Sequence, residues 1–195
     1  MEQPQVAKAE TEEIIRLANK VLLENVKGDF VEFGCYKGDT SVLLAKLLKD
    51  YKSGKKLWLY DSFAGLPEKT VEDSSAAGDQ FKKGELLVSK REVVEKFKRS
   101  SLPIPKIKKG FFENLNSTTD LPTEISFAFL DGDLYSSIKT SLNLVVPKLA
   151  EQGIVVVHDY NNPELPGSSR AVDEFLRTHP AFKLTQKHTL AILSH

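Results

Sequence analysis

Cysteine, methionine and tryptophan each occur only once among the 195 residues. A single cysteine, Cys35, excludes an intramolecular disulfide framework, and a chain of this length buries enough apolar surface to fold without one. No apolar run approaches the roughly 20 residues of a membrane-spanning helix, and the polar, acidic start is not a signal peptide. We therefore expect one soluble, cytoplasmic domain over 1–195, which begins with a flexible arm over 1–10.

An excess of charge of either sign is also missing. The 27 basic and 27 acidic residues give a formal net charge of zero. Nucleic-acid-binding proteins usually carry a basic excess, so the composition disfavours a nucleic-acid partner and leaves a small molecule as the expected one. The amphipathic segment 11–26 either covers the core or pairs with a second copy of the chain, which leaves a homo-oligomer open.

Short apolar runs alternate with amphipathic helical patterns along the whole chain. Continuously apolar strands separated by helices are typical of a parallel sheet covered on both faces. Two final runs, 181–186 and 189–193, predict an antiparallel hairpin at one edge. The pattern therefore predicts an α/β, doubly wound, mostly parallel seven-stranded sheet with an antiparallel C-terminal edge hairpin. The irregular segment 66–90 is long for a compact domain, and we expect it to form a lid. The other expected strands are 29–34, 56–61, 104–108, 125–130 and 153–157, and the expected helices are 11–26, one from residue 39, 89–99, 136–149 and 169–178.

Acidic residues and glycines follow nearly every expected strand. In doubly wound sheets, ligands bind outside the carboxyl ends of the strands, where the strand order switches. These positions therefore form the candidate site. They are Glu32, Gly34 and Gly38 after the first strand, Asp61 and Ser62 after the second, Asp131 and Asp133 after the fourth, and His158 and Asp159 after the fifth.

The turn from Glu32 to Thr40 contains two glycines four residues apart, Gly34 and Gly38. Glycine lets the backbone approach a ligand closely, and the helix that follows points free N–H groups at the same place. Asp61, 23 positions after Gly38, is suitably placed to bind ribose hydroxyls. The combination favours an adenosine-type ligand, whereas the missing G-x-G-x-x-G pattern disfavours a nicotinamide-dependent oxidoreductase. The alternatives are an ordinary strand-to-helix turn and an aspartate that caps its own turn.

Asp131, Asp133 and Asp159 form a second group at neighbouring strand ends. Carboxylates brought together repel one another unless a positive charge lies between them, and a hard divalent ion such as Mg²⁺ suits oxygen ligands. His158 is a further ligand or a base. The alternative is that these aspartates cap the following turn and helix, above all Asp133.

Six sequence blocks occur in the order typical of one enzyme family. The block VEFGCYKG at 31–38 resembles motif I of class I S-adenosylmethionine-dependent methyltransferases. Together with the other blocks it is similar to the macrocin O-methyltransferase (TylF-like) family. The other blocks are DSFAGLP at 61–67, LDGDLYSS at 130–137, HDY at 158–160, PG at 166–167 and AVDEF at 171–175.

The resemblance implies a Rossmann-like methyltransferase sheet and a metal-assisted methyl transfer, with Mg²⁺ as the expected ion. The acceptor would be a hydroxyl of a sugar or natural-product small molecule. By this resemblance, Glu32 and Gly34 line the methionine end of S-adenosylmethionine, and Asp61 holds the ribose hydroxyls with Ser62 beside it. Tyr36, Gly38, Thr40, Ser41 and Asp131 complete the expected cofactor contacts. The expected metal ligands are Asp131, His158 and Asp159, and the expected catalytic residues are Asp133 and His158.

One position departs from the family. Characterised members tend to have two adjacent aspartates where this chain has His158 and Asp159. The departure implies either a different set of metal ligands or a weaker site. It also supports an alternative function, a noncatalytic domain that binds S-adenosylmethionine or a nucleoside and has lost the metal.

Overall fold

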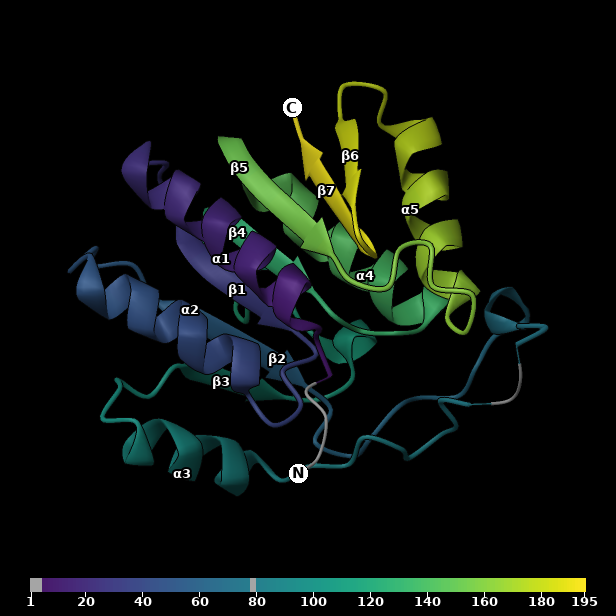
Figure 1. Cartoon of the computed structure of the whole chain (residues 1–195), viewed down its shortest axis with the longest axis horizontal. Helices are drawn as coiled ribbons and strands as arrows, with labels where there is room; N and C mark the ends of the chain where they lie inside the picture. Colours follow the sequence, from purple (N-terminus) through teal and green to yellow (C-terminus); the bar gives the residue numbers. More distant parts are fainter. Residues whose placement is uncertain (1–4, 78–79) are drawn as a thin grey trace.

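A computed structural model describes residues 5–77 and 80–195 of the chain (Figure 1). The helices are α1 (Lys8–Leu23), α2 (Asp39–Asp50), α3 (Lys90–Arg99), α4 (Tyr135–Val145) and α5 (Pro166–Thr178), with 3-10 turns η1 (Val71–Asp73), η2 (Phe112–Asn114) and η3 (Val146–Lys148). The strands are β1 (Asp29–Phe33), β2 (Leu57–Asp61), β3 (Lys106–Lys109), β4 (Ile125–Leu130), β5 (Leu149–Val157), β6 (Lys183–Lys187) and β7 (Leu190–Ser194).

The seven strands form one sheet in the order β3-β2-β1-β4-β5-β7-β6. Strands β1 to β5 pair in parallel, whereas β7 runs antiparallel to both β5 and β6. This arrangement confirms the predicted doubly wound, mostly parallel sheet with a C-terminal hairpin at its edge. The strand order switches between β1 and β4, which puts the carboxyl ends of these two strands at the expected ligand position.

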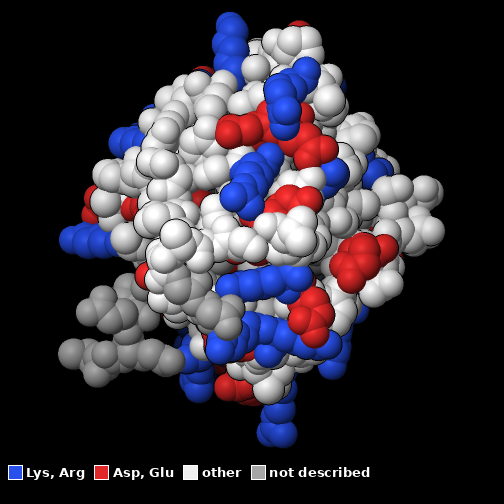
Figure 2. All heavy atoms as spheres, turned by 90° about the vertical axis from the view of Figure 1, so that its right-hand side faces the viewer, with Lys and Arg blue, Asp and Glu red and all other residues white. Residues whose placement is uncertain are grey.

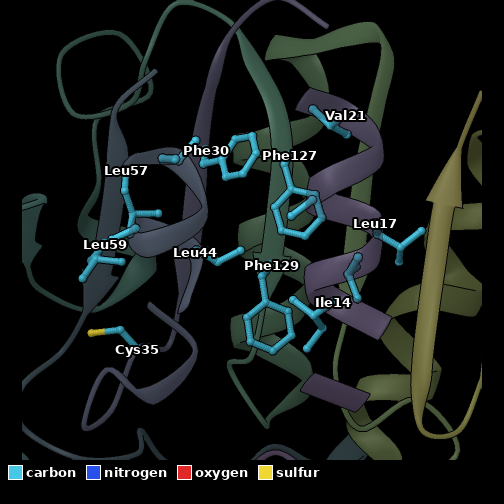
Figure 3. Packing of buried hydrophobic residues seen from close by; sticks show 14 of the residues in the cluster. Ile14, Leu17, Val21, Phe30, Cys35, Leu44, Leu57, Leu59, Phe127 and Phe129 are labelled. Atoms are coloured by element: carbon cyan, nitrogen blue, oxygen red, sulfur yellow. The ribbon is translucent and has the colours of Figure 1, made fainter. Parts of the chain in front are cut away.

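Two apolar layers hold the helices on the sheet. Because neighbouring side chains of a strand point to opposite faces, Phe127 and Phe129 of β4 pack with α1, α2 and α3, whereas Ala128 and Leu130 pack with α4 and α5. Figure 3 shows the first layer, where Phe127 and Phe129 face Ile14 and Leu17 of α1. Both faces of β4 are thus fully buried, as its largely apolar sequence predicts.

The N-terminal segment differs from the prediction. Helix α1 begins at Lys8, and both Val6 and Glu10 are buried. The expectation of a flexible arm over 1–10 is therefore wrong for residues 8–10, while residues 1–4 lie outside the described part. The local sequence is polar, and only contacts with distant residues explain why Glu10 is buried.

Two other boundaries differ because of proline. Helix α4 ends at Val145, and Pro147 lies in the 3-10 turn η3, since proline cannot donate the next helical hydrogen bond. Helix α5 begins at Pro166, three residues earlier than expected, because proline is favoured in the first helical turn.

Charges of both signs mix on the surface. Figure 2 shows acidic and basic side chains interspersed on one face of the molecule. Within residues 5–77 and 80–195, no helix has the length and apolar character needed to cross a bilayer.

The core packing of β4 gives a first test. Phe127 is fully buried, and its ring centroid lies 5.2 Å from that of Phe30. We expect Phe127→Ala to lower the free energy of unfolding by about 3–5 kcal/mol, measured by urea denaturation, because the truncation leaves a cavity. Leu184→Ala on the exposed edge strand is the control, with an expected loss under about 1 kcal/mol. Equal losses in both variants would contradict the proposed packing.

Candidate functional site

The carboxyl ends of β1, β2, β4 and β5 open into one cavity. Most residues predicted for the site line it, and the segments that follow β2 and β3 supply apolar walls. The predicted residues that line the cavity are Gly34, Tyr36, Asp61, Ser62, Asp131, Asp133, His158 and Asp159. Four further predicted residues, Glu32, Gly38, Thr40 and Ser41, do not line it: Glu32 is buried in β1, and the other three lie at the start of α2.

The backbone is left-handed just after each of the four strands that end at the cavity. Tyr36, Phe63, Asp133 and Asp159 have φ values of 43°, 47°, 60° and 58°. This conformation is unfavourable for residues other than glycine and persists only where surrounding contacts impose it. At each of these four strand ends the chain therefore turns sharply where it borders the cavity.

Gly34 makes the approach of two strand ends possible. It has a φ of 85°, and a Cβ atom placed there would lie 1.9 Å from the carbonyl oxygen of Asp131. The N–H of Asp131 in turn donates to the carbonyl of Phe33 at 2.8 Å. Only glycine therefore lets the end of β1 pack against the end of β4, which joins the glycine turn to the acidic group.

Asp61 accepts hydrogen bonds from two turns, the one after β1 and the one after β2. Its Oδ2 accepts a hydrogen bond from the N–H of Tyr36 at 3.0 Å, and its Oδ1 accepts one from Phe63 at 2.8 Å. The alternative interpretation of Asp61 as a cap of its own turn is thus correct, and it is compatible with ligand binding, because each carboxylate oxygen accepts more than one bond. Burial raises the pKa of Asp61 above its ordinary value. Beside it, Ser62 donates to Gly65 and belongs to the same turn.

Glu32 is a buried acid, and the charged groups near it among the described residues are the carboxylates of Asp39, Asp61 and Asp131. Among the described residues, neither its Oε2 nor the nearby Ser41 Oγ has a hydrogen-bond partner. Burial raises the pKa of Glu32 to about 8. Unpaired buried polar atoms are rare in folded proteins and are often explained by a ligand. A carboxyl in this state, directly behind Gly34, fits a ligand that brings a positive charge to the turn.

His158 lies between three carboxylates. Its Nδ1 is 2.8 Å from Asp131 Oδ1 and 3.0 Å from Asp159 Oδ2, while its Nε2 is 3.3 Å from Glu10 Oε2. Burial alone would lower the pKa of His158, but Asp131, Asp159 and Glu10 outweigh it and raise the pKa. The hydrogen bond from His158 lowers the pKa of Glu10 to about 2, so Glu10 is ionised.

The same atoms fit a divalent ion. One ligand atom from each of Asp131, His158 and Asp159 lies within 4.8 Å of the other two. Two ligands about 2.1 Å from one ion and at right angles to each other would be about 3 Å apart, close to the two Nδ1–oxygen distances. The fit requires an unprotonated Nδ1, with the ring proton on Nε2 facing Glu10.

Glu10 is a site residue that no local sequence pattern identifies. It precedes His158 by 148 positions and belongs to no motif, so no local signal indicates the contact. Its buried position near the start of α1 is evident only from the packing of that helix against β4 and β5.

Asp133 lines the cavity beside Asp131. Burial, together with the charges of Asp131 and Asp159, raises its pKa well above the ordinary value. The alternative, that Asp133 caps the following helix, is wrong: the N-cap of α4 is Leu134, and the N–H of Tyr135 at the start of the helix donates to Asp73 instead. The Asp133 carboxyl therefore remains available to a ligand in the cavity. An upward shift of its pKa is the direction that suits a general base at neutral pH.

The segment 66–90 borders the cavity, and hydrogen bonds join it to itself and to later parts of the chain. Leu66, Phe81 and Leu86 line the cavity, and the N–H of Leu66 donates to the carbonyl of Glu85 at 2.9 Å. Farther along, Asp73 Oδ1 accepts from the N–H of Tyr135 at 2.7 Å, at the start of α4. Residues 78–79 of the predicted lid lie outside the described part.

The sequence model of one family, described as macrocin-O-methyltransferase (TylF), matches residues 4–186 of the chain. The chain belongs to this family. A demethyldecarbamoylnovobiocin O-methyltransferase of Streptomyces niveus is 31% identical to this TylF-family chain over 172 residues, which cover 84% of the chain and 64% of that protein. The structure of the O-methyltransferase NovP is 28% identical with a TM-score of 0.81, and the match covers 95% of this chain and 78% of that one.

A second relative carries a sugar in its name. It is an 8-demethyl-8-(2,3-dimethoxy-alpha-L-rhamnosyl)-tetracenomycin-C 4'-O-methyltransferase of Streptomyces olivaceus, 31% identical over 148 residues. The match covers 72% of this TylF-family chain and 56% of that protein. The chain thus spans less than two thirds of the length of these two curated relatives.

The raised pKa of Glu32 predicts how stability depends on pH. The folded state favours the protonated acid, so this contribution to stability is present below about pH 4.5 and is lost as the pH rises through 8. We expect Glu32→Gln to gain stability relative to the wild type, on the order of 3 kcal/mol, between pH 5.5 and 8.5. Urea denaturation across this range measures the difference, and a difference that does not change with pH would contradict the assignment.

Proposed function

We propose that this TylF-family chain transfers the methyl group of S-adenosylmethionine to a hydroxyl of a sugar or natural-product small molecule, with a divalent metal as a second cofactor. One observation carries the proposal: the glycine turn with Asp61 and the group of Asp131, Asp133 and Asp159 open into the same cavity at the switch in strand order.

The proposed cofactor fits the glycine turn. Asp61 would accept hydrogen bonds from the ribose hydroxyls, and Glu32, whose Oε2 has no hydrogen-bond partner among the described residues, would supply negative charge behind the turn for the ammonium of the methionine part. Gly34 leaves no side chain between the ligand and the turn, and the first turn of α2 directs its N–H groups to the same place. Tyr36, whose N–H is held by Asp61, lines the cavity beside them.

The reaction is an in-line displacement at the methyl carbon. The acceptor oxygen forms the new bond as the bond from carbon to sulfur breaks, and the sulfonium leaves as the neutral thioether. Asp133 takes the hydroxyl proton, and its raised pKa favours this transfer near neutral pH. Asp131 and Asp159, with His158, would hold a divalent ion, which would supply Lewis-acid chemistry and lower the pKa of the acceptor hydroxyl. The rest of the rate comes from alignment of the two reactants.

The cavity suits an acceptor with both polar and apolar parts. Phe81, Phe111 and Phe112 form apolar wall beside the carboxylates. The rhamnosyl group in the name of the S. olivaceus relative supports a sugar hydroxyl as the acceptor. We further propose that the segment 66–90 covers the bound reactants and excludes water, which strengthens the electrostatic interactions of the carboxylates.

The alternative is a noncatalytic domain that binds the cofactor without a metal. The contacts of His158 with Asp131, Asp159 and Glu10 favour it, because a protonated imidazole would supply the positive charge that the carboxylates need. Binding of the cofactor without metal affinity, and without methyl transfer to a panel of sugars and phenols, would support this alternative.

Cofactor binding tests the first half of the proposal. We expect the wild type to bind S-adenosylhomocysteine in calorimetric titration, and Asp61→Asn to weaken the binding about tenfold or more, because a charged acceptor for the ribose is lost. Asp50→Asn, an exposed change at the other end of α2, is the control and should leave the affinity unchanged. A wild type that binds neither S-adenosylmethionine nor its product at high micromolar concentration would rule out the function.

Proton transfer tests the second half. We expect Asp133→Asn to slow methyl transfer by about 10²–10⁴-fold, while the affinity for S-adenosylhomocysteine stays within about threefold. In the wild type, kcat/KM should rise with pH through the raised pKa of Asp133, and this dependence should disappear in the variant. Full activity of Asp133→Asn would assign the base elsewhere.

A further inference from the structure

Glu10 reaches the candidate metal site from a helix that carries no motif. Its Oε2 lies 3.3 Å from Nε2 of His158, and both side chains are almost completely buried. Its Oε1 accepts hydrogen bonds from the N–H of Thr189, at 3.2 Å, and from the Thr189 hydroxyl. The carboxylate is thus held in place from two sides, by α1 and by the turn between β6 and β7.

The contact with Glu10 orients the His158 ring so that Nε2 faces Glu10 and Nδ1 faces Asp131 and Asp159. Oε1 of Glu10 already accepts the two hydrogen bonds from Thr189, so Oε2 is the atom that faces Nε2 as an acceptor, which places a ring proton on Nε2. Nδ1 then lies toward the gap between the two aspartates, 2.8 Å and 3.0 Å from their nearest oxygens. A histidine that binds a metal through one nitrogen usually donates its other N–H to a carboxylate, and Glu10 is in that position.

An imidazole ligand changes which ions a site prefers. Carboxylates and water suit Mg²⁺, whereas imidazole favours later first-row ions such as Fe²⁺, Co²⁺, Ni²⁺ and Zn²⁺. The two adjacent aspartates typical of the family would give the metal only oxygen ligands at these positions. This chain has His158 and Asp159 there, so its three candidate ligands are one imidazole nitrogen and two carboxylates. The change therefore alters ion selectivity rather than removing the site.

Building on the proposed function, we propose that Glu10 is a positioning residue that fixes His158 with Nδ1 as a ligand, and that the site consequently takes a late first-row divalent ion in preference to Mg²⁺. Co²⁺ is the suitable probe, because its unpaired electrons shift the proton resonance of a coordinated imidazole far from the rest of the spectrum.

The first experiment compares Co²⁺ and Mg²⁺ by calorimetric titration of the wild type and His158→Asp. The all-oxygen variant is the matched control, because Co²⁺ binds more tightly than Mg²⁺ to most ligands. The preference for Co²⁺ is the dissociation constant for Mg²⁺ divided by that for Co²⁺. We expect this ratio to be at least about tenfold lower in His158→Asp than in the wild type. The Co²⁺-loaded wild type should show one shifted, exchangeable N–H resonance, which disappears in D₂O and in His158→Asp. An equal ratio in both proteins, or no shifted resonance, would overturn the inference.

The second experiment isolates Glu10. Glu10→Ala should weaken Co²⁺ binding about 10–100-fold, the usual effect of losing the acceptor behind a metal-bound histidine. Glu10→Gln keeps an acceptor oxygen and should recover most of the affinity and of the shifted N–H resonance. Thr189→Val removes one support of Glu10 but not its contact with His158, and should stay within about threefold of the wild type. Equal affinities in Glu10→Ala and the wild type would contradict the positioning role.

Titration with S-adenosylhomocysteine in parallel separates the two proposals. A wild type that binds this product but neither ion would overturn the inference and leave a metal-free methyltransferase. A wild type with the shifted resonance and the expected ion preference, but without product binding, would support the inference and overturn the proposed function. Unchanged product binding in Glu10→Ala shows that a loss of Co²⁺ affinity does not come from unfolding.

Discussion

The whole site depends on the close contact between the ends of β1 and β4. Gly34 lies where any side chain would collide with the Asp131 carbonyl, and the N–H of Asp131 donates to Phe33 beside it. Because the strand order switches between these two strands, this contact sets the distance between the glycine turn and the acidic group. A larger residue at this position would separate the two halves, even if every other residue of the site were kept.

Sequence patterns predict the sheet and its strand ends well, because hydrophobic periodicity and turn residues within short segments determine them. The largely apolar run at 125–130 indicates a strand buried on both faces, and β4 has those bounds in the structure. The rule that ligands bind at the carboxyl ends of strands then selects Asp61, Asp131, Asp133, His158 and Asp159, all of which line the cavity. The sugar acceptor and the identity of the metal stay predictions, because they depend on loop shape and on ion affinity, which no local rule describes.

What sequence patterns miss depends on contacts between distant segments. Glu10 looks like part of a polar arm, yet it is buried because α1 brings it to His158 and the β6–β7 turn brings it Thr189. The left-handed backbone of Asp133 is equally invisible in the sequence, since no propensity favours that conformation for aspartate strongly enough to predict it. The helix-cap interpretation of Asp133 fails for this reason: the strained residue turns the chain before α4 begins.

The bond between Asp73 and the N–H of Tyr135 has a thermodynamic consequence. Tyr135 begins α4 two positions after Asp133, so a single short stretch of backbone both anchors the segment 66–90 and carries the carboxylate that would accept the proton. A displacement of that segment that breaks the bond removes an acceptor from the α4 N-terminus and loosens the adjoining strained residue. In the proposed function, where this segment covers the reactants and Asp133 is the base, the two roles would be linked equilibria, and a ligand that stabilises one would shift the other in the same direction.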